Sequence, residues 1–168
     1  MRKIKFKYRK EGILRKFIIL LIMSVLTILI RYVFSIDVYR PNLVIPTIVY
    51  LSLIAPTGEV IWLSFTGGIL IDIFSYTVIG SYTIPLILLS WLLCLIRDLI
   101  YRRVWYIYII ATAITTMIVS IIIYSITSYC FKTELLFTIT TKEIMLNMLI
   151  DSSAMILLLP IFRLFLKE

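Results

Sequence analysis

Two carboxylates and one guanidinium stand inside otherwise apolar segments, and their types suit them to chemistry. Asp72 and Asp151 interrupt two apolar runs, and Arg31 lies near the end of a third. Counted at about 1.5 Å per residue from flanking charges, all three fall in the outer half of a hydrocarbon core about 30 Å thick. Asn147 precedes Asp151 by one helical turn. We therefore expect an intramembrane polar cluster of Arg31, Asp72, Asn147 and Asp151.

This cluster has three interpretations. Unpaired charges are costly inside a membrane, so we favour a structural cluster in which Arg31 satisfies Asp72, Asp151 or both. The second is a cluster lined by water or by a partner subunit. The third is catalysis, because two aspartates can share a proton and act as an acid–base pair. Asp72 ends the sequence Gly-Ile-Leu-Ile-Asp and Asp151 follows Leu-Ile, so the signature of intramembrane aspartyl proteases is missing. We therefore expect a protein that is not an enzyme.

The composition indicates a polytopic α-helical membrane protein. Of the 168 residues, 62% are hydrophobic, and the mean hydropathy is +1.08. The apolar runs are continuous, whereas the strands of a membrane β-barrel alternate in polarity. The chain has no histidine and two cysteines, which excludes histidine-based catalysis and disfavours a cysteine/histidine metal site. We expect no cofactor and one transmembrane domain, residues 17–168, after a basic segment, residues 1–16.

The apolar runs position the charged residues on an all-α bundle of six transmembrane helices. Residues 1–16 carry eight basic side chains and one acidic one, which indicates a cytoplasmic N-terminus. The same segment suits contact with anionic membrane lipid or an acidic partner, whereas nucleic acid is not expected. With six spans the C-terminus is also cytoplasmic. The expected helices cover residues 17–34, 42–55, 60–74, 82–96, 104–124 and 144–164.

Two features of this helix assignment leave room for alternatives. The second and third helices are short for a span, so they form either two spans or one re-entrant hairpin. Pro46 is expected to kink the second helix. Residues 131–143 are expected to form the longest outer loop.

One face of the third helix combines small residues with an acid. Ser64, Gly68 and Asp72 are spaced i, i+4, i+8, so they lie on one helical face. Small residues let a second helix approach closely in a membrane. This face is therefore a candidate for helix packing or for partner contact, and the sequence does not separate the two roles.

Three segments resemble the MreD family of rod shape-determining membrane proteins. They are YRPNLVIPTIVYLSLIAP, GGILIDIFSYTVIGS and the basic LIRDLIYRR. In that family an Arg-Pro-Asn/Asp sequence opens the second helix, a Gly-x-x-x-Asp follows, and a further glycine comes about eight residues later. The matching residues here are Arg40, Pro41, Asn42, Gly68, Asp72 and Gly80. Phe74, Ser75 and Tyr76 depart from the family's small residue or turn former after the aspartate.

The resemblance implies a non-enzymatic role in building the lateral cell wall of a bacterium, in the plasma membrane. Its implied partners are MreC and, through MreC, the MreB cytoskeleton, the glycosyltransferase RodA and a class B penicillin-binding protein. The implied fold is similar to that of the substrate-binding subunits of energy-coupling-factor transporters. On this view Arg40, Pro41, Asn42, Ser64, Gly68, Asp72 and Gly80 serve fold integrity or partner contact.

The alternative is a substrate-capture subunit of an energy-coupling-factor vitamin transporter, which would share the six-helix architecture. Those subunits commonly carry an Ala-x-x-x-Ala pattern on the first helix, and residues 17–34 contain no alanine. Asp72, Tyr76, Tyr82 and Asn147 are the polar and aromatic groups that such a ligand pocket would use.

Overall fold

The regular secondary structure of the described part of the chain is α-helical throughout, which confirms the all-α part of the prediction. The computed structural model describes residues 13–34, 42–74, 78–97, 105–131 and 137–166. Six helices lie in these ranges. They are α1 (Ile13–Phe34), α2 (Val44–Ile54), α3 (Thr57–Phe74), α4 (Thr83–Ile96), α5 (Trp105–Phe131) and α6 (Phe137–Leu166).

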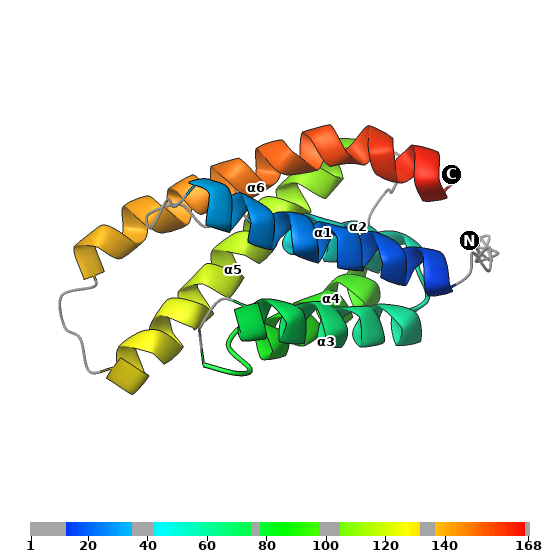
Figure 1. Ribbon diagram of the computed structural model, residues 1–168. Helices are drawn as coiled ribbons and strands as arrows, with labels where there is room; N and C mark the ends of the chain where they lie inside the picture. Colours follow the sequence, from blue (N-terminus) through cyan, green and yellow to red (C-terminus); the bar gives the residue numbers. More distant parts are fainter. Residues whose placement is uncertain (1–12, 35–41, 75–77, 98–104, 132–136, 167–168) are drawn as a thin grey trace.

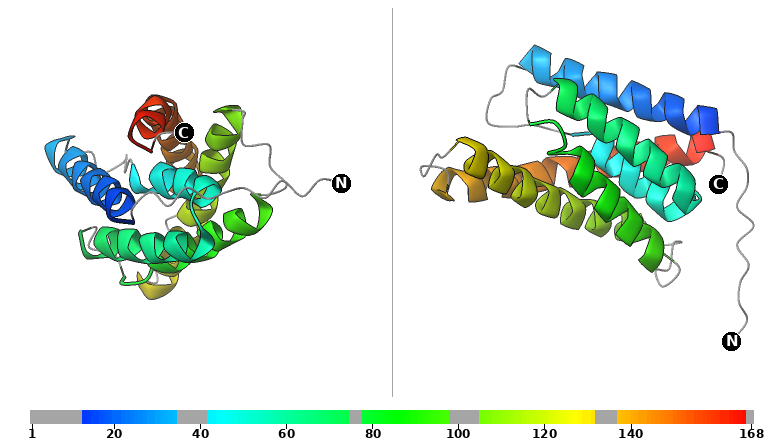
Figure 2. Two further views of the ribbon diagram at one scale, coloured as in Figure 1. Left: turned by 90° about the vertical axis from the view of Figure 1, so that its right-hand side faces the viewer. Right: turned by 90° about the horizontal axis from the view of Figure 1, so that it is seen from below.

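The short helix α2 forms the centre of the bundle. Every side chain of its first ten residues is buried, and α2 packs against each of the other five helices. The end-on view in Figure 2 shows α2 enclosed by them. An all-round apolar helix is expected in such a position, so α2 contributes to the core rather than to a surface.

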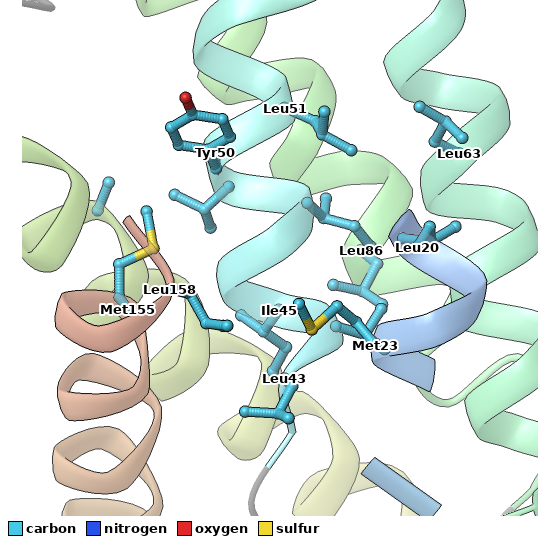
Figure 3. Packing of buried hydrophobic residues seen from close by; sticks show 14 of the residues in the cluster. Leu20, Met23, Leu43, Ile45, Tyr50, Leu51, Leu63, Leu86, Met155 and Leu158 are labelled. Carbon is cyan, nitrogen blue, oxygen red and sulfur yellow. The ribbon is translucent and has the colours of Figure 1, made fainter. Parts of the chain in front are cut away.

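The core around α2 is built from side chains of all its neighbours. Figure 3 shows Leu20 and Met23 of α1, Leu86 of α4 and Met155 of α6 directed towards the residues of α2. On its other side, Tyr50 of α2 packs between two aromatic rings from α5 and α6. Its ring centroid lies 5.4 Å from that of Tyr108 and 4.8 Å from that of Phe162. Aromatic pairs at these separations are mutually stabilising.

Helices α3 and α4 form one closely packed antiparallel pair, and α5 and α6 form another. Figure 1 shows that α1 begins and α6 ends at the same end of the bundle. At the opposite end, α5 and α6 project beyond α1 and α3 (Figure 1). The bundle is therefore longest on its α5–α6 side.

Four helices have the length and apolar composition of membrane spans. The qualifying segments are Ile13–Ile30, Thr57–Phe74, Trp105–Ile126 and Lys142–Phe165. Helices α2 and α4 are apolar but shorter than this. Helix α3 begins three residues earlier than predicted, at Thr57, and so reaches spanning length on its own.

The predicted outer loop over residues 131–143 is wrong in part. Helix α5 continues to Phe131 and α6 begins at Phe137, so most of the expected loop is helical. The polar residues there led to a loop prediction, but Thr, Lys and Glu are compatible with a helix whose end stands outside the hydrocarbon core.

Pro46 is the third residue of α2. At that position the missing N–H would have no partner inside the helix anyway.

Candidate functional site

The carboxylate of Asp72 closes the N-terminus of the helix that follows it. Asp72 lies in the last turn of α3 and is 1% exposed. It accepts main-chain hydrogen bonds from Gly80 at 2.8 Å, Tyr82 at 2.8 Å and Thr83 at 3.2 Å. The hydroxyls of Ser81 and Thr83 donate to it at 3.2 and 2.5 Å. The first N–H groups of a helix have no partner within the helix, so Asp72 supplies the cap that α4 lacks.

Two glycines make this cap sterically accessible. A Cβ placed on Gly68 would lie 2.5 Å from the Cα of Thr83, so any side chain there would collide with the backbone of α4. Gly80 has a φ of +100°, a conformation that L side chains rarely adopt. Gly68 therefore brings α4 close to α3, and Gly80 turns the chain so that its N–H groups point at Asp72.

The face formed by Ser64, Gly68 and Asp72 is internal. Ser64 is 0% exposed, and Gly68 is buried against Thr83 of α4. The Ser64 hydroxyl has no hydrogen-bond partner in the part of the chain that the structure describes. Ser64 therefore contributes to helix packing through the small size of its side chain. The close helix approach that this face favours is made by α4 of the same chain.

A second carboxylate closes the N-terminus of α2 in the same way. Asp151 of α6 is 1% exposed and accepts a hydrogen bond of 2.9 Å from the main-chain N–H of Asn42. The hydroxyl of Thr116 on α5 donates to its other oxygen at 3.1 Å. The next two N–H groups, of Leu43 and Val44, donate to Thr27 Oγ1 and to Asn42 Oδ1, both at 3.2 Å.

The C-terminal end of α2 is held by a buried arginine. Arg97, directly after α4 and 7% exposed, donates to the carbonyl oxygen of Ala55 and, at 3.3 Å, to Thr57 Oγ1. Two residues after Thr57, Glu59 of α3 forms an ion pair of 2.6 Å with Lys16 of α1. Both ends of the central helix are therefore satisfied by side chains from other helices, as a non-aqueous environment requires.

The structure places the predicted residues as follows. Asp72 and Asp151 cap different helices, and the described hydrogen bonds do not join them. Asn147 lies one turn before Asp151 and is 8% exposed. The side chain of Arg31, together with Arg40 and Pro41, lies outside what the structure describes. The pairing of Arg31 with either aspartate therefore stays a prediction.

Sequence reasoning missed three members of this arrangement. Arg97, Thr27 and Thr116 are not among the residues predicted from the sequence. For the two threonines the signal was a polar residue inside an apolar helix, which needs a partner in a membrane. The described residues contain no group of three or more Cys, Asp or Glu that is suited to hold a metal ion.

The Arg-Pro-Asn and Gly-x-x-x-Asp sequences are the features that suggest a family from the sequence alone. A family model described as "rod shape-determining protein MreD" matches residues 9–168. The chain belongs to the MreD family. Comparison with curated proteins and with solved structures gives no match.

Membership of the MreD family carries a role in rod shape determination. MreD proteins are structural membrane proteins and do not form a known enzyme family. In this chain the Gly68-x-x-x-Asp72 sequence provides one close helix crossing and one helix cap. This match favours the shape-determining role over the vitamin-transporter alternative.

Proposed function

We propose that this protein is a non-enzymatic component of the cell-wall elongation machinery that binds MreC. Through MreC it would connect with RodA, a class B penicillin-binding protein and the MreB cytoskeleton. The observation that carries this proposal is the family match over residues 9–168, nearly the whole chain. The match extends beyond the motif residues to the remaining helices, in which the sequence alone shows only an apolar composition.

The absence of catalysis is part of the proposal and rests on the two carboxylates. Both oxygens of Asp72 accept hydrogen bonds from the start of α4. Both oxygens of Asp151 are engaged by Asn42 and Thr116. A catalytic dyad needs two carboxylates within reach of one proton, whereas here each aspartate stabilises a separate helix terminus.

We further propose that residues 17–168 form a single six-helix transmembrane domain, with residues 1–16 and the C-terminus in the cytoplasm. Support comes from the common end of the bundle at which α1 begins and α6 ends (Figure 1). Lys16 and Arg163 lie in the helix turns at that end. The proposed fold resembles that of the substrate-binding subunits of energy-coupling-factor transporters.

The partner surface follows from what the bundle already uses. Because Ser64 is buried and Gly68 and Asp72 contact the start of α4, MreC would contact an outward helix face. Asn42, Gly80 and the buried residues of α3 would then hold the helices in position, so that their outward faces are presented to the partner. Arg40 and Pro41 stay candidates for either role.

The test is purification of the tagged protein from a rod-shaped bacterium that depends on it. Photo-crosslinking residues are placed at exposed positions on three helices, Leu21 of α1, Trp62 of α3 and Leu157 of α6. We expect mass spectrometry to identify MreC, crosslinked from one helix and not from the other two. Recovery of transporter ATPase and coupling subunits without MreC would overturn the proposal.

A further inference from the structure

Helix α6 carries a proline on its outward side. Pro160 lies inside α6, which continues past it to Leu166, and it is exposed. Proline has no N–H group, so the carbonyl oxygen of Ile156, four residues earlier, cannot accept the usual helical hydrogen bond. Among the described residues, no side chain is found to donate to this oxygen. The Ile156 carbonyl is therefore an acceptor that the helix leaves without its usual donor.

This acceptor lies at the depth of the hydrocarbon core. Ile156 precedes Arg163, the basic residue in the last turn of α6, by seven residues, which is about 10 Å of helix. The side chain of Ile156 is 52% exposed, so this part of the helix faces away from the bundle. Unsatisfied main-chain groups are strongly disfavoured in hydrocarbon. The starts of α2 and α4 receive side-chain partners from other helices, and the Ile156 carbonyl needs a partner of the same kind.

The surface around this acceptor suits a second helix. Helix α6 packs against α5 and α2, and its opposite side bears four exposed residues at the spacing i, i+4, i+7, i+11. They are Leu149, Ser153, Ile156 and Pro160, here called the α6 seam. This spacing places the four residues in one stripe along the helix. The small side chain of Ser153 lets a neighbouring helix approach closely in a membrane.

We propose that the α6 seam binds a transmembrane helix of a partner protein, and that this helix donates a side-chain hydrogen bond to the Ile156 carbonyl. The donor would be a hydroxyl or an amide group. The inference rests on the proposed function, which makes MreC the partner. Hydrogen-bond complementarity selects this occupant, because the acyl chains of lipids carry no donor. A second copy of the chain is less suited, since the outward hydroxyls of Thr66, Ser125 and Ser153 already donate to carbonyls of their own helices.

The test uses the tagged full chain, produced together with MreC in a host that lacks both proteins. A photo-crosslinking residue in place of Leu149, which is 60% exposed, reports which molecule lies against the α6 seam. The amount of MreC recovered with the tagged chain reports binding. Pro160→Ala restores the N–H group, so that the Ile156 carbonyl can form its own helical hydrogen bond. Ser153→Leu blocks close approach, and Thr66→Leu on the outward side of α3 is the matched control.

We expect MreC to be crosslinked from the seam, and Pro160→Ala to bind it about fivefold more weakly through the loss of one hydrogen bond. The thermal stability of this variant in detergent should be equal to or higher than that of the parent, which separates lost binding from lost folding. Ser153→Leu should weaken binding at least about tenfold, whereas Thr66→Leu should not change it.

Two kinds of failure can be told apart. Unchanged binding in Pro160→Ala would overturn the inference, and so would crosslinking from Leu149 to a second copy or to lipid alone. In either case MreC would still be recovered with the parent chain, and the proposed function would stand. If MreC were not recovered with the parent chain at all, the proposed function would fail, and the inference with it.

Discussion

The carboxylate of Asp72, in the last turn of α3, lies 2.5 Å from the hydroxyl oxygen of Thr83, the first residue of α4. The Cα of the same threonine lies 2.5 Å from where a Cβ on Gly68 would be. Thr83 is therefore clamped from two sides by residues one helical turn apart. The Gly-x-x-x-Asp sequence acts as one structural unit, in which the first residue permits the approach that the second requires.

Gly68→Ala should destabilise the protein, because the added methyl group meets backbone and not the end of a flexible side chain. We expect a loss of about 1–3 kcal/mol, the usual cost of overpacking a close contact. The measurement is reversible unfolding in detergent. Gly58→Ala is the matched control, since nothing lies within 4 Å of a Cβ there. Equal effects of the two substitutions would contradict the clamp.

Asp72→Ala should be more damaging than Asp72→Asn. Alanine leaves the N–H groups of Gly80, Tyr82 and Thr83 without an acceptor in a buried setting, for which we expect a cost of at least about 3 kcal/mol. Asparagine keeps one acceptor oxygen and should fall between alanine and the parent. The assay is thermal stability in detergent, with Ser153→Ala at an exposed position of α6 as control. A stable, folded Asp72→Ala protein would show that α4 does not need its cap.

Ser64→Ala should be close to neutral, within about 1 kcal/mol, because the serine hydroxyl is buried without a described partner. Ser64→Leu should prevent assembly, since the position is fully buried. Size-exclusion profiles of the two variants distinguish a requirement for small size from a requirement for a hydroxyl. A strong defect in Ser64→Ala would show that the hydroxyl has a binding role.

Thr116 and Asp151 should be energetically coupled. Thr116→Val removes the donor to Asp151 Oδ2, and Asp151→Leu removes the acceptor of both Thr116 and Asn42. In a double-mutant cycle we expect a coupling of about 1 kcal/mol. Additive effects would mean that the two side chains do not stabilise each other. Thr112→Val, at a hydroxyl that bonds only its own helix among the described contacts, is the control.

Reversing the ion pair between Lys16 and Glu59 tests the contact between α1 and α3. Each single charge reversal places like charges 2.6 Å apart at sites that are 5% and 20% exposed, and we expect a loss of about 1–3 kcal/mol. The double reversal should recover part of it. Stability is compared at low and high salt, where a partly buried pair should respond weakly. If the single reversals were as stable as the parent, this ion pair would not stabilise the contact between α1 and α3.

The fold class and most of the helices could be predicted from the sequence because apolar runs are long and their breaks are marked. Pro56 and Gly80 are residue types that interrupt helices, and they lie in the turns before α3 and α4. The α5–α6 connection could not be predicted in the same way. Its polar residues are equally compatible with a loop and with a helix that leaves the hydrocarbon core, and hydropathy does not distinguish the two.

Asp72, Asp151 and Gly68 could be predicted as members of the candidate site, whereas Arg97, Thr27 and Thr116 and the connections between the members could not. The spacing of Gly68 and Asp72 placed them on one face, and that face is indeed a close helix crossing. Depth estimates put Asp72 and Asp151 at similar levels, but depth carries no information about position around the bundle. The pairing of Asp151 with Asn42 depends on a contact across 109 residues, and no local pattern encodes it.

That long-range contact has a consequence for biosynthesis. The residues before α2 are synthesised early, yet the acceptor for the N–H of Asn42 lies on α6, 109 residues later in the chain. Until α6 is inserted, the main-chain N–H of Asn42 lacks its acceptor on Asp151. A chain without α6 therefore has an unsatisfied donor at the start of its central helix. Membrane proteases would therefore meet a less stable core in chains that stop before α6 than in chains that contain it.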